Sequence, residues 1–106
     1  MNLNKKHCVP CEGGTQPLKV DEAEKYLNDV PDWSIKDGKS IEREFRFKDF
    51  KEAVKFVNRV AKIAESEGHH PDIYIFYNRV TLSLSTHAIG GLSENDFILA
   101  AKINSV

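Results

Sequence analysis

Two stretches of this chain alternate apolar and polar residues with a period of two, and each follows a tight-turn signal. Residues 41–47 read IEREFRF, and residues 80–86 read VTLSLST. A period of two predicts β-strands with one buried face. Asp37-Gly38 predicts a hairpin turn before the first stretch, and Asn78-Arg79 predicts one between residues 72–77 and the second stretch. The chain is therefore predicted to contain two antiparallel hairpins.

Three other segments carry helix signals, because each begins with a capping residue that has an acidic residue three positions later. We expect helices over about residues 21–29, 49–66 and 93–104. The longest has apolar residues at spacings of three and four, and Gly68 predicts its end. The predicted buried stripe of this helix is Phe50, Val54, Val57, Ala61 and Ala64, and the three predicted cap pairs are Asp21 with Glu24, Asp49 with Glu52, and Ser93 with Asp96. The order of elements predicts an α+β fold, in which a four-stranded antiparallel sheet is covered on one face by three helices.

Size and charge narrow the class of protein. A chain of 106 residues favours one domain with a modest core, which we assign to residues 18–106, with a polar N-terminal extension at 1–17 outside the core. The net charge of −1 gives no electrostatic reason to expect direct nucleic-acid binding. No apolar run approaches the ~20 residues of a membrane span, and no apolar segment of a secretory signal follows Lys5 and Lys6. We expect a cytoplasmic protein.

The extension contains one CxxC motif, formed by Cys8 and Cys11. A structural zinc usually takes four ligands, whereas this stretch offers three with His7. A redox CxxC should follow a strand and open a helix, whereas residues 12–14 indicate a loop. A tail without a role in function is the favoured interpretation, and metal or redox chemistry stays open.

Three of the four histidines lie within nineteen residues, at positions 69, 70 and 87. If Tyr77 pairs with Val80 across the second turn, His70 and His87 face each other at the open end of that hairpin. Directly opposed side chains have Cβ atoms within about 5 Å. A slip of the register by one residue would remove this juxtaposition.

Three interpretations of the histidines follow. They could satisfy backbone groups at strand ends, as single histidines commonly do. They could bind a metal, although adjacent residues on an extended chain point to opposite sides, and Pro71 favours that geometry at His70. They could also perform metal-free acid–base catalysis, since histidine both gives and takes protons near neutral pH. The convergence of three histidines favours catalysis.

Three further residues have two interpretations each. Asp96 could orient a histidine or a substrate, but its position after Ser93 is that of a helix cap, which we favour. Glu65, one helical turn before His69, could hold a histidine tautomer or be a solvated acid. Trp33 could form one wall of a flat pocket, although a core position is favoured.

Three segments together are similar to the signature of the pterin-4a-carbinolamine dehydratases, also called 4a-hydroxytetrahydrobiopterin dehydratases. They are residues 65–71 (ESEGHHP), 77–87 (YNRVTLSLSTH) and 91–96 (GLSEND). The resemblance extends upstream through residues 45–50 and Trp33, and it covers about residues 20–104. The joint pattern is specific, although each piece alone is weak.

The resemblance implies a hydro-lyase that removes water from 4a-hydroxytetrahydropterin, giving quinonoid dihydropterin, in the tetrahydrobiopterin recycling that serves aromatic amino acid hydroxylases. It implies catalytic roles for His69, His70 and His87, with no metal and no organic cofactor. One imidazolium would protonate the departing 4a-hydroxyl while a base accepts the proton lost from the pterin ring. We assign proton transfer to His69 and His87, and substrate holding to His70.

The expected substrate contacts include these histidines and the residues around them: Gly68, Ser85, Thr86, Trp33, Glu65 and Asp96. The resemblance also implies a homo-oligomer, either a dimer or a tetramer, and a possible hydroxylase partner. A function of another class is the alternative: a protein-binding module that acts as a dimerisation cofactor of a transcription factor.

Overall fold

The computed structural model describes residues 3–9 and 16–106. The elements follow in chain order: η1 (Leu3–Lys5), α1 (Val20–Leu27), β1 (Ser34–Lys36), β2 (Ser40–Arg46), α2 (Phe50–Glu67), β3 (Asp72–Phe76), β4 (Arg79–Leu84), η2 (His87–Ile89) and α3 (Glu94–Asn104). The predicted order of helix, two strands, helix, two strands and helix is confirmed by α1 to α3 and β1 to β4.

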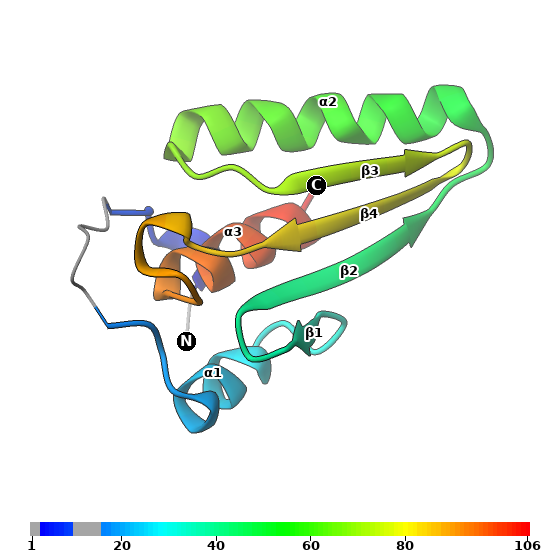
Figure 1. Cartoon of the computed structure of the whole chain (residues 1–106). Coiled ribbons are helices and arrows are strands. Elements are labelled where there is room, and N and C mark those ends of the chain that lie inside the picture. The colour runs from blue at the N-terminus through cyan, green and yellow to red at the C-terminus, as the bar shows by residue number, and fades with distance from the viewer. Residues whose placement is uncertain (1–2, 10–15) are drawn as a thin grey trace.

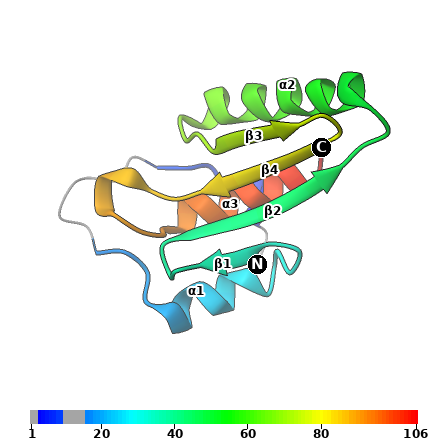
Figure 2. The same ribbon diagram turned by 45° about the vertical axis from the view of Figure 1, so that its right-hand side comes forward.

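The four strands form one antiparallel sheet in the order β1-β2-β4-β3. Figures 1 and 2 show α2 along the β3 side of the sheet, α3 behind the central strands and α1 beside β1. The inward side chains of β4, Val80, Leu82 and Leu84, are fully buried, whereas Thr81 and Ser83 between them are partly exposed. The predicted α+β fold is confirmed. No helix in the described ranges is both long and apolar enough to cross a bilayer.

The first hairpin has the predicted turn. Asp37 and Gly38 have φ angles of +53° and +68°, and the Lys39 N–H donates to the Lys36 carbonyl at 3.0 Å. Two central residues with positive φ form the primed turn that matches the twist of antiparallel strands. The hairpin turn predicted from Asp37-Gly38 is therefore confirmed.

The predicted register of the second hairpin is wrong by two residues. Val80 pairs with Ile75 rather than with Tyr77, and the two-residue turn is Tyr77-Asn78, with Tyr77 at φ +52°. Asn78 is fixed there from β2, because its carbonyl accepts the Phe47 N–H at 2.8 Å and its side-chain amide donates to the Phe47 carbonyl at 3.2 Å. A shift of two residues keeps the same side chains on the buried face, so the alternation survives the error.

The second helix begins after the predicted cap, since Asp49 accepts the Glu52 N–H at 2.9 Å. The predicted stripe is correct at Ala64, which is buried, and in part at Val57, which is partly buried against the core. It is wrong at Phe50, which is 52% exposed, because the helix turns its neighbouring stripe inward. Phe56 packs there against Phe45 and Phe47, with ring centroids 4.6 and 4.9 Å apart. The buried residues of the helix are Ala53, Phe56, Val60 and Ala64.

The first helix begins earlier than predicted. Its cap position is Lys19, whose N–H donates to the Glu22 carboxylate at 3.0 Å. The predicted pair of Asp21 and Glu24 is therefore wrong by about one half-turn, because a Glu at the third helical position serves the backbone N–H before the helix.

Gly68 ends α2 in the left-handed conformation, with φ +65°, and its N–H donates to the Ala64 carbonyl. A Cβ built on Gly68 has no atom within 4 Å, so a substitution would meet backbone strain rather than a clash. We expect Gly68→Ala to lower the free energy of unfolding by about 1–2 kcal/mol, measured by urea denaturation. Gly68→Asn should cost less, because Asn tolerates this conformation. Equal losses for both variants would contradict this explanation.

The N-terminal segment was predicted to lie outside the core, and this prediction is wrong for Leu3. Leu3 is 1% exposed and belongs to the main apolar cluster. The Lys102 ammonium on α3 donates to the Asn4 carbonyl at 3.0 Å, and Lys6 pairs with Glu94 at 2.9 Å. The segment is thus packed along α3. Cys11, the second residue of the CxxC motif, lies outside the described residues.

Candidate active site

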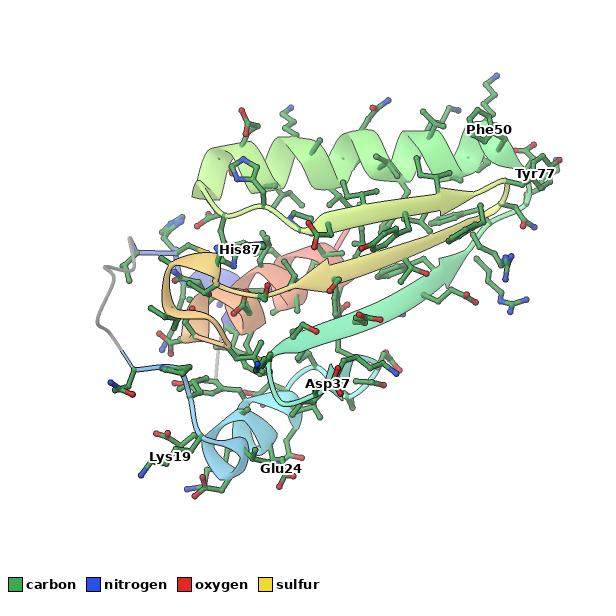
Figure 3. The ribbon with its side chains drawn as sticks, viewed as in Figure 1. Lys19, Glu24, Asp37, Phe50, Tyr77 and His87 are labelled. Carbon is green, nitrogen blue, oxygen red and sulfur yellow. The ribbon has the colours of Figure 1, made fainter. Side chains whose placement is uncertain are left out.

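A pocket of about 680 Å³ lies where the end of α2, the end of β4, η2 and the start of α3 meet. Figure 3 shows His87 at this end of the molecule, with Phe50 and Tyr77 at the opposite end of the sheet. The pocket is lined by Cys8, Val9, Glu65, Ser66, Glu67, Gly68, His69, His70, Ser85, Thr86, His87, Ala88 and Asn95. The three histidines that are close in sequence therefore share one cavity.

His69 reaches this cavity because α2 ends at Gly68 and the chain bends there. The His69 side chain is 12% exposed, and its Nε2 lies 2.6 Å from Oδ1 of Asp96, which is fully buried. The other carboxylate oxygen of Asp96 accepts the Thr86 hydroxyl and the Ser93 N–H, both at 2.9 Å. Asp96 therefore serves both of the roles weighed from sequence, since it caps α3 and also holds His69. A carboxylate on one ring nitrogen fixes the tautomer and leaves Nδ1 to face other groups.

His70 pairs with a different carboxylate. Its Nε2 is hydrogen-bonded to Glu65, and both side chains are largely exposed. The sequence spacing suggested that Glu65 would hold His69, but the bend at Gly68 directs His69 to Asp96 instead. Two adjacent histidines thus have two separate acidic partners.

His87 does not face His70 across the hairpin. The ladder of β3 and β4 ends at the pair of Asp72 and Ser83, and His87 begins the short helix η2 instead of extending β4. Its ring is exposed and has no hydrogen-bond partner within residues 3–9 and 16–106. The predicted proximity arises from a turn after β4 rather than from strand pairing, and it leaves the His87 ring available to a ligand.

Two of the other predicted contacts have structural roles. The Thr86 hydroxyl donates to Asp96 and is hydrogen-bonded to Ser93 at 2.7 Å, so its proton is already used. Trp33 is 1% exposed in the core, where its indole N–H donates to Asn104 at 2.9 Å. Trp33 is absent from the pocket lining, so it forms no wall of this pocket. Gly68, Ser85 and Glu65 do line it.

Sequence reasoning missed Glu67 and the N-terminal segment that covers it. The Glu67 side chain is 7% exposed and lies 3.0 Å from His7 and 3.6 Å from Lys102, and it accepts the Cys8 N–H at 2.7 Å. Burial opposes ionisation of this carboxyl, but the Cys8 N–H, His7 and Lys102 together lower its pKa. The contact joins residues 59 positions apart, and no local pattern signals it.

Cys8 is a partly buried thiol in this arrangement. Burial, with the nearby carboxylates of Glu67 and Asp96, raises the pKa of Cys8 to about 12. The thiol is therefore protonated at neutral pH, and it lacks the thiolate character of a nucleophile or metal ligand. Within the described parts of the chain, no group of three His, Cys, Asp or Glu side chains is arranged to hold a metal ion.

The lowered pKa of Glu67 predicts a pH-dependent contribution to stability. A carboxyl whose pKa is lowered by folding stabilises the protein above its ordinary pKa of 4.5, and this stabilisation is lost as pH falls through the folded value. We expect Glu67→Gln to cost about 1–2 kcal/mol near neutral pH, and the difference from wild type to shrink below pH 4.5. Urea denaturation of both proteins across this range measures it. A difference independent of pH would contradict the role of the charge.

Comparisons with known proteins agree with this architecture. The sequence model of the family described as "Pterin 4 alpha carbinolamine dehydratase" matches residues 16–106. A protein of Halorhodospira halophila named "Putative pterin-4-alpha-carbinolamine dehydratase" is 49% identical over 107 residues, which cover 100% of this chain and 98% of that protein. A protein of the same name from Rubrobacter xylanophilus is 46% identical and covers 96% of this chain and 95% of its own length.

A solved structure is also similar. The transcriptional coactivator/pterin dehydratase of Brucella melitensis superimposes with a TM-score of 0.79 at 37% identity, covering 85% of this chain and 97% of that one. The sequence match over nearly the whole length and the shared fold lead to the same conclusion. The chain belongs to the pterin 4 alpha carbinolamine dehydratase family, which is named for a hydro-lyase activity.

Proposed function

We propose that this protein dehydrates 4a-hydroxytetrahydropterin to quinonoid dihydropterin by histidine acid–base catalysis, without a metal or organic cofactor. The observation that carries the proposal is the convergence of His69, His70 and His87 on one pocket. Two of these rings are paired with carboxylates, and the third is exposed to the cavity without a partner among the described residues. Membership of the family supplies the substrate class.

The reaction needs one proton donor and one proton acceptor. The bond from C4a to the hydroxyl oxygen breaks as an imidazolium protonates the leaving hydroxyl, and a neutral imidazole takes the proton that the pterin ring loses. Water leaves and no electron is transferred, so the dehydration balances without a redox partner. His69 and His87 perform these transfers: Asp96 holds the Nε2 of His69 at 2.6 Å, and the exposed His87 lines the same pocket.

Asp96 is a positioning residue in this scheme. It is fully buried, and it is bonded to His69, Thr86 and Ser93 rather than exposed to the pocket. His70 holds the substrate, since its pairing with Glu65 at the exposed rim presents an oriented ring. Each acid or base contributes about 10²–10⁴ in rate, which suffices for a carbinolamine that already loses water spontaneously.

The test is direct. 4a-Hydroxytetrahydropterin generated in situ should lose water faster with the protein than without it. At a protein concentration of about 1 μM, the dehydration rate should exceed the spontaneous rate by about two orders of magnitude or more. The rate should be the same after dialysis against a strong chelator. Loss of activity on chelation, restored by a divalent metal, would replace the metal-free mechanism with a metal site. No acceleration by folded protein would reject the function.

The wider role follows from the product. Quinonoid dihydropterin is the form that is reduced back to the tetrahydro cofactor, so the proposed place of the enzyme is tetrahydrobiopterin recycling beside an aromatic amino acid hydroxylase in the cytoplasm. Accumulation of the carbinolamine in a coupled hydroxylase assay that lacks this protein, and its removal when the protein is added, would support this placement.

Self-association is part of the proposal. Part of the apolar stripe predicted on α2 is not packed in the core: Phe50 is 52% exposed, Val54 is partly exposed and Ala61 is exposed. Such a stripe supports a dimer or tetramer, because isolated apolar faces of this kind are usually covered. Light scattering of wild type and Val54→Glu measures it: the variant should have the smaller mass.

A protein-binding function is the second candidate, and one observation favours it: the similar Brucella melitensis protein is described as a transcriptional coactivator as well as a pterin dehydratase. The two functions are separable. Substitution of the pocket histidines should abolish dehydration and leave binding of a protein partner intact, whereas Val54→Glu should do the reverse.

A further inference from the structure

The N-terminal wall, defined as Cys8-Val9, closes one side of the histidine pocket. Both residues line the cavity together with the histidines, although they are about 60 positions away in sequence. The family's sequence model begins at residue 16, so this wall is outside the part of the chain that defines the family. The wall is therefore a candidate for a feature that distinguishes this pocket from those of other family members.

The wall is held by specific contacts. The Cys8 N–H donates to Glu67 at 2.7 Å, and the Cys8 thiol donates to the Asn95 carbonyl at 3.6 Å. Asn95, which is 4% exposed, bonds Val9 twice: it accepts the Val9 N–H at 3.0 Å and donates to the Val9 carbonyl at 2.6 Å. A side-chain amide that pairs with both the N–H and the carbonyl of one residue fixes the position of that residue as a neighbouring strand would.

The anchors connect the wall to the catalytic side of the pocket. Asn95 precedes Asp96 on the first turn of α3, and Glu67 is two residues before His69 on the last turn of α2. Leu3, buried in the core, holds the segment from its other end. The wall is thus positioned by the same two helix ends that position His69.

The chemistry of the pocket lining defines what it accepts. Cys8 contributes a protonated thiol and Val9 an apolar side chain, and the Cys8 N–H, the Val9 N–H and the Val9 carbonyl are already paired. Two carboxylates, Glu65 and Glu67, line the cavity, and no lysine or arginine does so within the described ranges. An uncharged substituent would fit this surface, whereas an anionic one would meet the carboxylate of Glu65 or Glu67 and no lysine or arginine in the lining.

We propose that Cys8-Val9 is a specificity-determining wall of the pterin pocket, which contacts the substituent at C6 of the pterin ring and selects pterins with a short uncharged substituent. The inference rests on the proposed dehydration: C6 is joined to the reacting carbon C4a through N5, so histidines that meet the reacting atoms bring the C6 substituent into the same cavity, which Cys8 and Val9 also line. Val9 is 65% exposed, so it lies at the mouth of the pocket. A substituent on the bound ring would extend out of the cavity there.

The experiment compares two substrates. The carbinolamines carry either a 6-methyl group or a 6-(1,2-dihydroxypropyl) group, and kcat/KM is measured for wild type, Val9→Trp and Val9→Ala. Val20→Trp is the matched control, since Val20 is 58% exposed and is not among the residues that line the pocket. We expect Val9→Trp to change the ratio of the two kcat/KM values by about fivefold or more against the larger substituent. Val9→Ala should change it in the opposite direction, and Val20→Trp should leave it as in wild type.

The outcomes separate the wall from the reaction. If the wild type dehydrates both substrates and the ratio of the two kcat/KM values is unchanged in both Val9 variants, the proposed role of the wall is wrong. The proposed dehydration would stand. An equal fall for both substrates would also overturn it, because it indicates a structural role only. A wild type that accelerates neither reaction would reject the proposed function itself, and the wall with it.

Discussion

Replacing His69 by glutamine is expected to lower kcat for dehydration by a factor of about 10²–10⁴. The glutamine amide can still donate to Asp96, whose buried carboxylate lies 2.6 Å from the histidine nitrogen in the wild type. The variant therefore keeps the hydrogen bond and loses the ability to exchange a proton. Steady-state kinetics, with a thermal unfolding curve for each protein, separate the loss of chemistry from a loss of fold.

The fourth histidine provides the matched control. His7 is 80% exposed on its side chain and is absent from the pocket lining, so His7→Gln should keep kcat within about twofold of wild type. His87→Gln should resemble His69→Gln, whereas His70→Gln should raise KM more than it lowers kcat. A His69→Gln protein with wild-type kcat would remove His69 from the mechanism.

Replacing Asp96 by asparagine is expected to have the second large effect, on both rate and stability. Asp96 is fully buried and accepts three donors, from His69, Thr86 and Ser93. An amide nitrogen would face one of these donors, which leaves a buried polar group unpaired at a cost of about 2–3 kcal/mol. The His69 ring would also lose the acceptor that fixes its tautomer, so kcat should fall on the order of 10²-fold or more.

Asp49→Asn is the control for this substitution. Asp49 also accepts a backbone N–H at the start of a helix, as the cap residue of α2, whereas Asp96 accepts the N–H of Ser93, the residue before α3. Asp49 is absent from the pocket lining, and asparagine caps helices as well as aspartate does. It should leave kcat and stability close to wild type. The dependence of kcat on pH should change in Asp96→Asn and not in Asp49→Asn. An unaltered pH profile in Asp96→Asn would mean that Asp96 acts only as a cap.

Local patterns were sufficient to predict the arrangement of elements. The alternation in β2 and β4, the Asp37-Gly38 turn and the cap at Asp49 depend on residues close in sequence, and all three are confirmed. The register of the second hairpin was not predictable in this way. It depends on Phe47, more than thirty positions from Asn78 in the chain, and on a tyrosine with positive φ. The buried face of α2 was ambiguous, because two adjacent stripes of that helix are apolar.

The candidate site was predicted in part. The sequence indicated that His70 and His87 approach each other, and both line one pocket, although a turn rather than strand pairing brings His87 there. The pairing of His69 with Asp96 could be listed only as an alternative, since 27 residues separate them. The contact between Cys8 and Glu67 could not be predicted from the sequence pattern, because it is made by one backbone N–H and a carboxylate that is distant in sequence.

The most direct measurement compares wild type with the triple variant His69→Gln, His70→Gln and His87→Gln in the dehydration of 4a-hydroxytetrahydropterin, after both proteins have been shown to unfold cooperatively. The account predicts that the wild type accelerates dehydration far above the spontaneous rate and that the triple variant returns it to that rate. A folded triple variant that retains the wild-type acceleration would contradict catalysis by these histidines.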